Sequence, residues 1–399
     1  MKNKSIKNKI FASALALTLT IGAFQLPSYV ANAAEPNTPQ LKIKKVLNLP
    51  KDGVSTPDET FTFLFTGHSL NNDEKKKNEL PPIQDTKAIF DNTMTTDADP
   101  TILGKQIVKL TDDVLKGVQF TKAGQYTYSV TEKKGDKTDM TYSQASYLVS
   151  LFVGANDKGQ FEVKSIQIKQ EKDDKGTVKG DAKKTPYTPG TNDDKGQGNN
   201  FVFNNNYDPK AGNDKPNGKT ITEDDKKGFV LRKEISGNDV NVNEKFKFNI
   251  TATKPEGSHS DATTFKYKVV TNGTAGLEQT GTYGTPFDVE LKHEDRVVFS
   301  NVLLGTTVKA EETVDGGYTK DIKTGSKING QEVGTVDKLK AGLAIGDHTD
   351  GNFVNFVNTQ QTATGILMNH LPFIALVFAA GAGILFFVKN KKEDENAQA

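Results

Sequence analysis

Polar and apolar residues alternate along most of the chain in short segments, the pattern of β-strands with one buried face. The segments are rich in β-branched and aromatic residues, and Gly, Asn, Asp and Pro separate them. No long helical periodicity appears between them, only turns such as 112–116. We therefore predict an all-β protein of sandwich type. The expected strands are 61–65, 118–120, 126–131, 147–153, 161–168, 201–203, 245–252, 264–270, 287–291, 296–302, 307–310 and 353–357.

Two further segments place a lysine where a strand should bury an apolar side chain. Side chains alternate faces along an extended chain. The inward positions are Leu41, Ile43, Lys45 and Leu47 in the first segment, and Phe229, Leu231, Lys233 and Ile235 in the second. An unpaired ammonium group in a core costs several kcal/mol. Each lysine should therefore be neutral, paired or covalently linked.

The same parity identifies an inward glutamate and asparagine after each lysine. Asn205 shares a face with Phe203, and Asn358 shares one with Phe356. Glu132 follows the inward Val130. Glu312 lies on the face of Val308 and Ala310, which leaves the adjacent Glu311 outside. Each half of the chain thus carries Lys, Glu and Asn directed at its own predicted core.

Burial lowers the pKa of a lysine and raises that of a glutamate, because it disfavours the charged forms. A neutral amine is a nucleophile, and a protonated carboxyl group can hydrogen-bond and polarise the asparagine carbonyl. Attack on this carbonyl, with ammonia leaving, would join Lys45 to Asn205 and Lys233 to Asn358. Glu132 and Glu312 would assist. The alternative is a lysine whose stem packs while its head reaches solvent, but the ordered triple in both halves favours the covalent interpretation.

The N-terminus has the pattern of a secretory signal over residues 1–33. Four lysines precede a mostly apolar stretch over residues 10–24, and Ala31-Asn32-Ala33 is a small-residue cleavage site. Cleavage between Ala33 and Ala34 is therefore expected. The alternative, an N-terminal membrane anchor, is disfavoured because the apolar run is short.

The C-terminus carries a second signal. Residues 371–388 form an uncharged run long enough to span a bilayer, within an expected transmembrane segment 366–388. The lysines of the tail 389–399 place that tail in the cytoplasm and the main chain outside. The motif 361–365, Gln-Thr-Ala-Thr-Gly, comes just before the span. A polar motif ending in Thr364-Gly365, an apolar span and a basic tail together resemble the cell-wall sorting signal of Gram-positive surface proteins.

The resemblance implies that a sortase cleaves between Thr364 and Gly365 and transfers the threonine carbonyl to an amine. The motif departs from the usual Leu-Pro-x-Thr-Gly. A dedicated pilus sortase is therefore expected rather than a general wall-anchoring one. A plain single-pass anchor is the alternative that the span alone would justify.

Composition supports an extracellular structural role. About 330 residues lie between the signal and the expected cleavage after Thr364, which suits two sandwich domains, here 34–208 and 229–360. Residues 209–228 read as a linker rich in Asp, Asn, Gly, Pro and Lys, and 169–200 as a long loop of similar composition. There is no cysteine, so resilience must come from another source. The 51 basic and 50 acidic residues are mixed, which argues against nucleic acid as a partner.

No enzyme motif is present. The histidines are scattered, and the sequence contains no HExxH, no GxSxG and no phosphate-binding glycine loop. The aspartate clusters lack the spacing of a calcium loop. We expect no metal, no cofactor and no turnover of an external substrate.

These motifs together resemble the two-domain major pilins of streptococci, the T-antigen type, whose modules are called pilin isopeptide linkage domains. The resemblance rests on Leu41-x-Ile43-x-Lys45, Tyr126-x-Tyr128-x-Val130-Thr131-Glu132, Phe203-x-Asn205, Leu231-x-Lys233-x-Ile235, Ala310-Glu311-Glu312 and Phe356-x-Asn358. It implies two tandem immunoglobulin-like (Cna-B-like) sandwiches whose first and last strands are tied by Lys–Asn isopeptide bonds. It also implies a pilus shaft subunit on the cell surface, made from a membrane-bound precursor.

The implied partners are a sortase, identical subunits in a covalent polymer, minor pilins, peptidoglycan at the pilus base, and a host surface. The resemblance places an acceptor lysine for the intersubunit bond shortly before the last strand of the first domain. Lys169 fits best, with Lys172, Lys175 and Lys210 as alternatives. A second interpretation of the whole chain is a wall-anchored adhesin or minor pilin that binds a host ligand.

Overall fold

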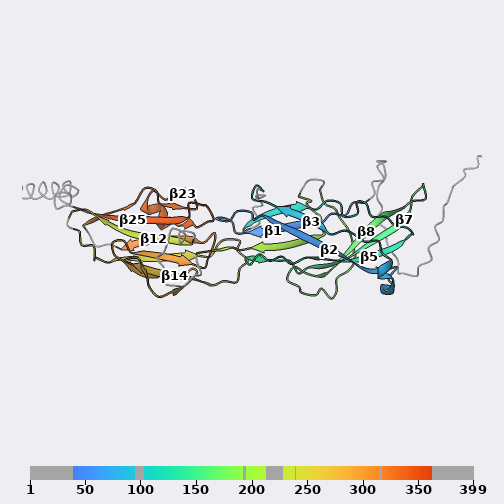
Figure 1. Cartoon of the computed structure of the whole chain (residues 1–399), viewed down its shortest axis with the longest axis horizontal. Coiled ribbons are helices and arrows are strands. Elements are labelled where there is room, and N and C mark those ends of the chain that lie inside the picture. The colour runs from blue at the N-terminus through green and yellow to red at the C-terminus, as the bar shows by residue number, and fades with distance from the viewer. Residues whose placement is uncertain are drawn as a thin grey trace, which may run out of the picture. The chain divides into compact units, whose positions relative to one another are not determined.

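The computed structural model describes residues 39–94, 103–191, 195–212, 228–238, 240–313 and 317–361. Strands dominate these residues and fall into two groups that follow each other along the sequence (Figure 1). The predicted signal 1–33 with its Ala33–Ala34 cleavage site, the motif residues Thr364 and Gly365, the span 366–388 and the tail 389–399 lie outside the described residues. Of the helices that are described, none is long and apolar enough to cross a bilayer.

The first group extends from residue 44 to residue 211. Its elements are β1 (Lys44–Leu49), β2 (Glu59–Leu70), the 3₁₀-helix η1 (Glu74–Glu79), β3 (Thr86–Phe90), β4 (Lys105–Leu110), β5 (Gly124–Glu132), β6 (Met140–Thr141), β7 (Ser146–Ala155), β8 (Phe161–Lys172), β9 (Thr185–Pro186), β10 (Val202–Tyr207) and β11 (Lys210–Ala211). A four-stranded sheet has the order β4-β1-β10-β6, and a six-stranded sheet has the order β3-β2-β5-β7-β8-β9.

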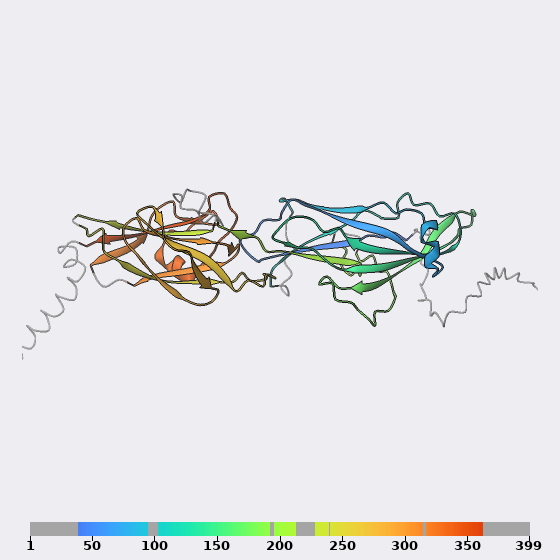
Figure 2. The same cartoon turned by 60° about the horizontal axis from the view of Figure 1, so that its bottom comes forward.

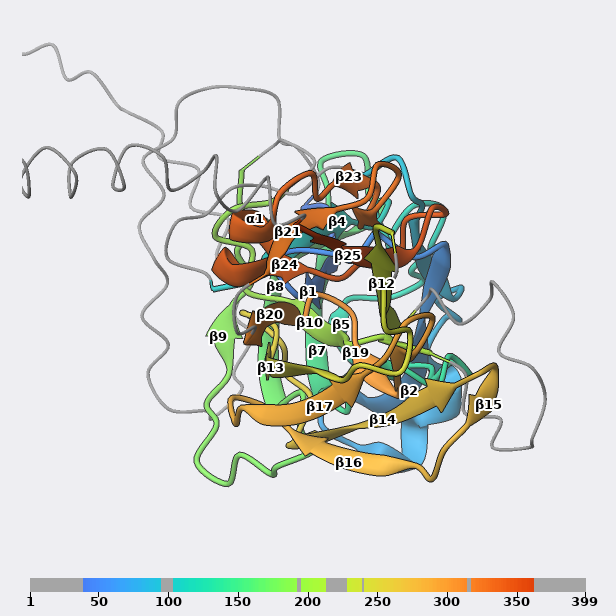
Figure 3. The same cartoon turned by 90° about the vertical axis from the view of Figure 1, so that its left-hand side faces the viewer.

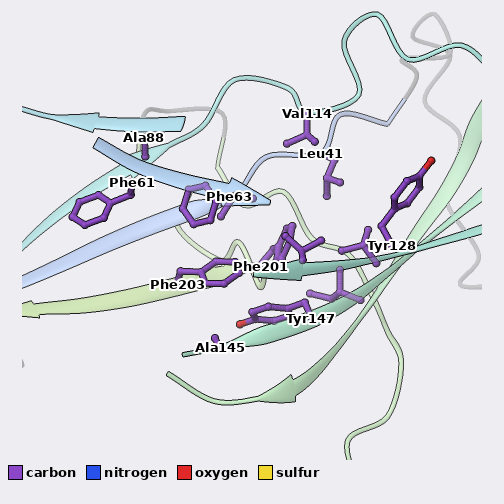
Figure 4. Close-up of a cluster of buried hydrophobic side chains, with 14 of the residues drawn as sticks. Leu41, Phe61, Phe63, Ala88, Val114, Tyr128, Ala145, Tyr147, Phe201 and Phe203 are labelled. Atoms are coloured by element: carbon purple, nitrogen blue, oxygen red, sulfur yellow. The ribbon is translucent and has the colours of Figure 1, made fainter. Parts of the chain in front are cut away.

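Inward side chains from both sheets form one buried cluster. Figure 4 shows Phe63 of β2 facing Phe203 of β10, with ring centroids 5.0 Å apart. Tyr147 of β7 packs against Phe203 and against Phe201, just before β10. The aromatic layer follows the alternation of the sequence, since each ring lies on the inward parity of its strand.

The second group extends from residue 229 to residue 360. Its elements are β12 (Phe229–Ser236), β13 (Phe246–Thr253), β14 (Thr264–Thr271), β15 (Thr274–Ala275), β16 (Gln279–Thr282), β17 (Phe287–Leu291), β18 (Arg296–Ser300), β19 (Val302–Leu303), β20 (Thr307–Thr313), β21 (Tyr318–Ile322), β22 (Lys327–Ile328), β23 (Gln331–Glu332), helix α1 (Val336–Ala341), β24 (Leu343–Ala344) and β25 (Asn352–Gln360).

These strands also form two main sheets around a separate buried cluster. The larger sheet has the order β15-β14-β18-β12-β25-β22-β23, with β16 on β14 and β21 on β25. The smaller has the order β17-β13-β20-β24. Helix α1 lies beside β20 and β21 and is labelled in Figure 3; it is the orange coil in Figure 2. Its Leu339 is buried.

The structure corrects several expected elements. Residues 118–120 form no strand, and only Phe120 makes an isolated bridge, to Phe161. The segment 296–302 is broken at Asn301, whose φ of +49° interrupts an extended chain. The expected loop 169–200 begins inside β8, which continues to Lys172, and it contains β9. The expected linker is ordered at its start, where β11 pairs with β19.

The two groups share one connection that positions the site. In each, the first strand lies next to the last long strand and runs parallel to it: β1 beside β10, and β12 beside β25. A strand of the opposite sheet, β5 or β20, carries the glutamate. The same arrangement of three strands therefore occurs twice.

Candidate functional site

Lys45 lies in the second strand of the sheet β4-β1-β10-β6, and its side chain is fully buried. The register pairs Lys45 with Phe203, and Leu47 with Asn205. Residues two apart share a face of a sheet, so Lys45 and Asn205 project into the core from neighbouring strands.

Glu132 comes from the opposite sheet, as the last residue of β5. Its Oε2 accepts a hydrogen bond from Nζ of Lys45 at 2.6 Å, and its Oε1 accepts one from Nδ2 of Asn205 at 2.5 Å. The side chains of Lys45 and Glu132 have no exposed area. One carboxyl group thus bridges the amine and the carboxamide. Lys45, Glu132 and Asn205 are called the first triad below.

Aromatic rings exclude water from the first triad. Nζ of Lys45 lies 4.4 Å from the ring centroid of Phe61. The fully buried Phe203 pairs with Lys45, and the fully buried Phe63 pairs with Glu132. Burial lowers the pKa of Lys45 to about 8, against the opposing charge of Glu132. Burial also raises the pKa of the Glu132 carboxyl group, which Lys45 counteracts. Both changes move the pair towards a neutral amine and a neutral acid.

The carbonyl oxygen of Asn205 has a different partner from the one expected. Its Oδ1 accepts a hydrogen bond of 2.7 Å from the backbone N–H of Ser143. A backbone N–H can only donate, so this contact fixes the orientation of the amide and turns Nδ2 towards Glu132. The carboxyl group therefore contacts the leaving nitrogen, not the carbonyl oxygen as the sequence argument supposed.

Lys233, Glu312 and Asn358, the second triad, repeat this arrangement. The register pairs Lys233 with Phe356 and Ile235 with Asn358, the same offset of two residues. Nζ of Lys233 lies 2.8 Å from Oε1 of Glu312, and Nδ2 of Asn358 donates to the same oxygen at 3.0 Å. Phe246 takes the place of Phe61, 4.4 Å from Nζ. Burial lowers the pKa of Lys233 to about 8 and raises that of Glu312.

The structure separates the two adjacent glutamates of β20. Glu312 is 2% exposed and faces Phe248 across the ladder. Glu311 points outward and forms an ion pair of 2.7 Å with Lys340. The residue chosen by parity is the buried one.

The two triads differ in how fully their polar atoms are bonded. Among the described residues, Oδ1 of Asn358, Oε2 of Glu312 and Nζ of Lys233 have no partner in hydrogen-bond geometry. The close approach of Lys233 to Glu312 is therefore an ion-pair contact. Lys320 adds a hydrogen bond of 2.6 Å from its Nζ to the backbone carbonyl of Glu312.

The candidate acceptor Lys169 lies inside β8, not at its end, and pairs with Leu148 of β7. Its side chain is 30% exposed, and Nζ lies 3.5 Å from Oε1 of Glu171. The alternatives Lys172, Lys175 and Lys210 are exposed. Over the ranges that the structure describes, no cluster of His, Asp or Glu side chains is arranged to hold a metal ion.

Sequence reasoning missed the residues around the triads. The alternation places Phe61 and Phe246 on the inward faces of expected strands, but it does not indicate that they contact the lysines. Ser143 and Asp174 lie in loops, and no periodicity marks a loop contact with a residue 62 or 30 positions away.

Comparison with known proteins finds similar domains and similar chains. Residues 41–208 match the model of the Spy0128-like isopeptide containing domain, and residues 227–360 match that of a domain of unknown function, DUF7601. A curated pilin of Streptococcus pyogenes serotype M1 is 23% identical over 363 residues, which cover 89% of this chain and 92% of the pilin. The resemblance to streptococcal pilins is thereby confirmed.

Solved structures of major pilins from Streptococcus pyogenes are also similar. One is 18% identical and covers 81% of this chain and 99% of its own, with a TM-score of 0.32. The T3.2 major pilin is 21% identical and covers 80% and 97%, also with a TM-score of 0.32.

Proposed function

We propose that this relative of the streptococcal pilins is the structural subunit of a covalent pilus shaft, strengthened by two internal Lys–Asn amides. The observation that carries the proposal is the buried Lys–Glu–Asn triad, which occurs twice with the same strand offset. A buried lysine without a partner would destabilise the fold by several kcal/mol. Two buried lysines, each with a Glu and an Asn partner at the same strand offset, indicate a common chemical function.

The bond-forming step follows from the contacts. In the first triad, the proton of the Lys45 ammonium passes to Glu132, which lies 2.6 Å away. The lone pair of the neutral Lys45 amine attacks Cγ of Asn205, and the π electrons of the carbonyl group move to Oδ1. Glu132 then gives its proton to Nδ2 and takes one from Nζ. The Cγ–Nδ2 bond breaks, ammonia leaves, and an uncharged amide remains.

Burial favours this reaction and protects its product. At pH 7 a lysine with a pKa of about 8 is neutral in roughly a tenth of molecules. An exposed lysine with a pKa near 10.4 would be neutral in fewer than about one in a thousand. The amide also removes the cost of two buried charges. Each bond forms once per domain, so the chain is not an enzyme.

Subunits would be joined through the C-terminal sorting motif of one subunit and a lysine in the first domain of the next. A sortase would cleave between Thr364 and Gly365 and join Thr364 to a lysine of the next subunit, with Lys169 as the proposed acceptor. The partly exposed side chain of Lys169 supports this choice, since an incoming enzyme-bound threonine needs access to its amine. Minor pilins and peptidoglycan at the pilus base would complete the assembly on the cell surface.

The two strand groups support a division into two domains. Residues 34–208 and 229–360 would each be an immunoglobulin-like sandwich, with 209–228 as the linker. Support comes from the two separate buried clusters and from family matches whose boundaries fall at the linker. The signal 1–33, the span 366–388 and the tail 389–399 would direct export and retention before sorting.

Peptide mapping of the purified chain by mass spectrometry tests the internal bonds. We expect a cross-linked peptide pair containing Lys45 and Asn205, and another containing Lys233 and Asn358, each lighter by one ammonia. Free side chains at both lysines in the folded protein would refute the proposal. Assembly is tested by blotting surface extracts, where a shaft subunit gives a high-mass ladder that deletion of the sortase removes. A single band in the presence of the sortase would indicate a monomeric surface protein.

A further inference from the structure

The two triads differ most on the carbonyl side of the asparagine. Oδ1 of Asn205 accepts the N–H of Ser143 at 2.7 Å, and both residues are buried. Oδ1 of Asn358 has no hydrogen-bond partner among the described residues. Negative charge develops on this oxygen when an amine attacks the carbonyl carbon, so the difference bears directly on reactivity.

Strand pairing explains why only the first triad has this donor. β10 pairs with β6 at Asn206–Thr141 and Tyr207–Met140, and β6 ends there. Ser143 follows that end, where its N–H is free to turn towards a side chain. Asn358 instead lies opposite Lys320 in the ladder of β21 and β25. Ladder N–H groups lie in the plane of the sheet, whereas the asparagine side chain leaves that plane.

Asp174 holds the Ser143 loop in place. Its Oδ1 accepts hydrogen bonds from Oγ of Ser143 at 2.6 Å and from the backbone N–H of Asn204 at 2.9 Å. Its Oδ2 accepts one from Nδ2 of Asn204 at 2.8 Å. The backbone carbonyl of Asp174 also accepts the N–H of Gln144. One carboxylate thus ties the loop to the residue next to Asn205.

We propose that the backbone N–H of Ser143 is an oxyanion donor for amide formation in the first triad, and that Asp174 is the residue that positions it. This inference rests on the proposed function. The electron pair displaced from the carbonyl of Asn205 collects on Oδ1 and is stabilised by the N–H. It returns to re-form the carbonyl as ammonia leaves. Glu132 handles only protons, between Nζ and Nδ2.

The expected change in the rate of amide formation can be taken from enzymes with an oxyanion donor. Loss of one oxyanion donor slows acyl transfer by about 10²–10³-fold. Asp174→Ala leaves the N–H present but removes the carboxylate contacts that fix its loop. Misplacement of a reacting group by about 1 Å can cost up to about 100-fold in rate. We expect closure of the first triad to slow by about 10-fold or more. Asp174→Asn keeps an acceptor oxygen for Ser143 and Asn204 but removes the charge, so it should close at close to the wild-type rate.

The experiment follows both amides in the same full-length molecule. Newly made chain is pulse-labelled in a heterologous host and quenched in acid at intervals. The closed fraction of each triad is then measured by peptide mapping. The second triad is the internal control for folding and recovery. Slow closure of the first triad in Asp174→Ala, normal closure of the second, and rescue by Asp174→Asn are the expected results.

Two results would overturn the inference. One is closure of the first triad at the wild-type rate in Asp174→Ala. The other is an Asp174→Asn variant as slow as Asp174→Ala, which would make charge, not positioning, the cause. Ser143→Pro, which removes the N–H itself, should slow the first triad alone, and normal closure in this variant would also contradict the inference. Absence of both amides in the wild-type chain would be a separate outcome, the failure of the proposed function.

Discussion

Glu311 and Glu312 are adjacent on β20 but face opposite ways, so replacing each with alanine separates the effect of burial from that of charge. Glu312→Ala removes the anion 2.8 Å from the fully buried Lys233 and the acceptor of Asn358. Glu311→Ala removes only an exposed ion pair with Lys340. We expect the first change to abolish the second amide and the second change to leave it intact.

The expected loss of stability in Glu312→Ala has two sources. The amide closes a loop of about 125 residues, and constraining the unfolded chain over that length is worth about 5 kcal/mol in the chain-entropy model. Without the bond, the buried lysine also lacks its counter-charge, a defect that typically costs about 3–5 kcal/mol. Either loss is large against the roughly 5–15 kcal/mol that holds a typical domain folded. Glu311→Ala should unfold like the wild type.

Peptide mapping measures the amide, and denaturant unfolding measures the free energy. Glu312→Gln guards against a variant that does not fold, because it keeps a side-chain acceptor for Lys233 but cannot carry the proton. It should fold and remain unlinked. An intact Lys233–Asn358 amide in Glu312→Ala, or its loss in Glu311→Ala, would refute the role given to Glu312.

Three further predictions concern the first domain. In Asn205→Ala, Lys45 stays unlinked with a pKa of about 8, below its unfolded value. The unfolded chain then binds more protons between about pH 8 and 10.4, so unfolding free energy should rise with pH in that window, by a few kcal/mol relative to the linked wild type. A flat difference would contradict the buried amine. In single-molecule force spectroscopy, unfolding of the first domain of the same variant should extend the chain by the roughly 160 residues between Lys45 and Asn205, a step of about 500 Å. The wild type should lack this step. Lys169→Arg should abolish the high-mass ladder but leave both internal amides closed, and an unchanged ladder would move the acceptor to another lysine.

Sequence alone predicted the residues of the two triads because a buried lysine violates a simple pattern. A charged residue on an inward parity is visible without a structure, and the register of β1 with β10 confirms the parity of Lys45 and Asn205. The choice of Glu312 over Glu311 rested on the same alternation, and the structure buries the chosen residue. Fold class followed from the same signal, since most expected strands overlap observed ones.

The elements that escaped prediction lack that signal. β4 buries only Ile107, and β21 buries only Ile322, so neither shows apolar alternation. The contact of Ser143 with Asn205 joins a loop to a strand through a backbone group, which every residue possesses. This donor cannot be predicted from the sequence, because its position depends on where β6 ends in the folded structure.

The position of the triads follows from how tension would pass through a shaft subunit. A pull on the chain enters each domain at its first strand and leaves at its last, and these strands are parallel neighbours. The proposed amide between them would carry the load directly from Lys45 to Asn205, so the residues between would bear none. Domains in series bear the same tension, and a single unlinked domain would extend first. A shaft subunit therefore needs the bond in both halves, which is why the repetition of the triad, more than either triad alone, favours a mechanical role.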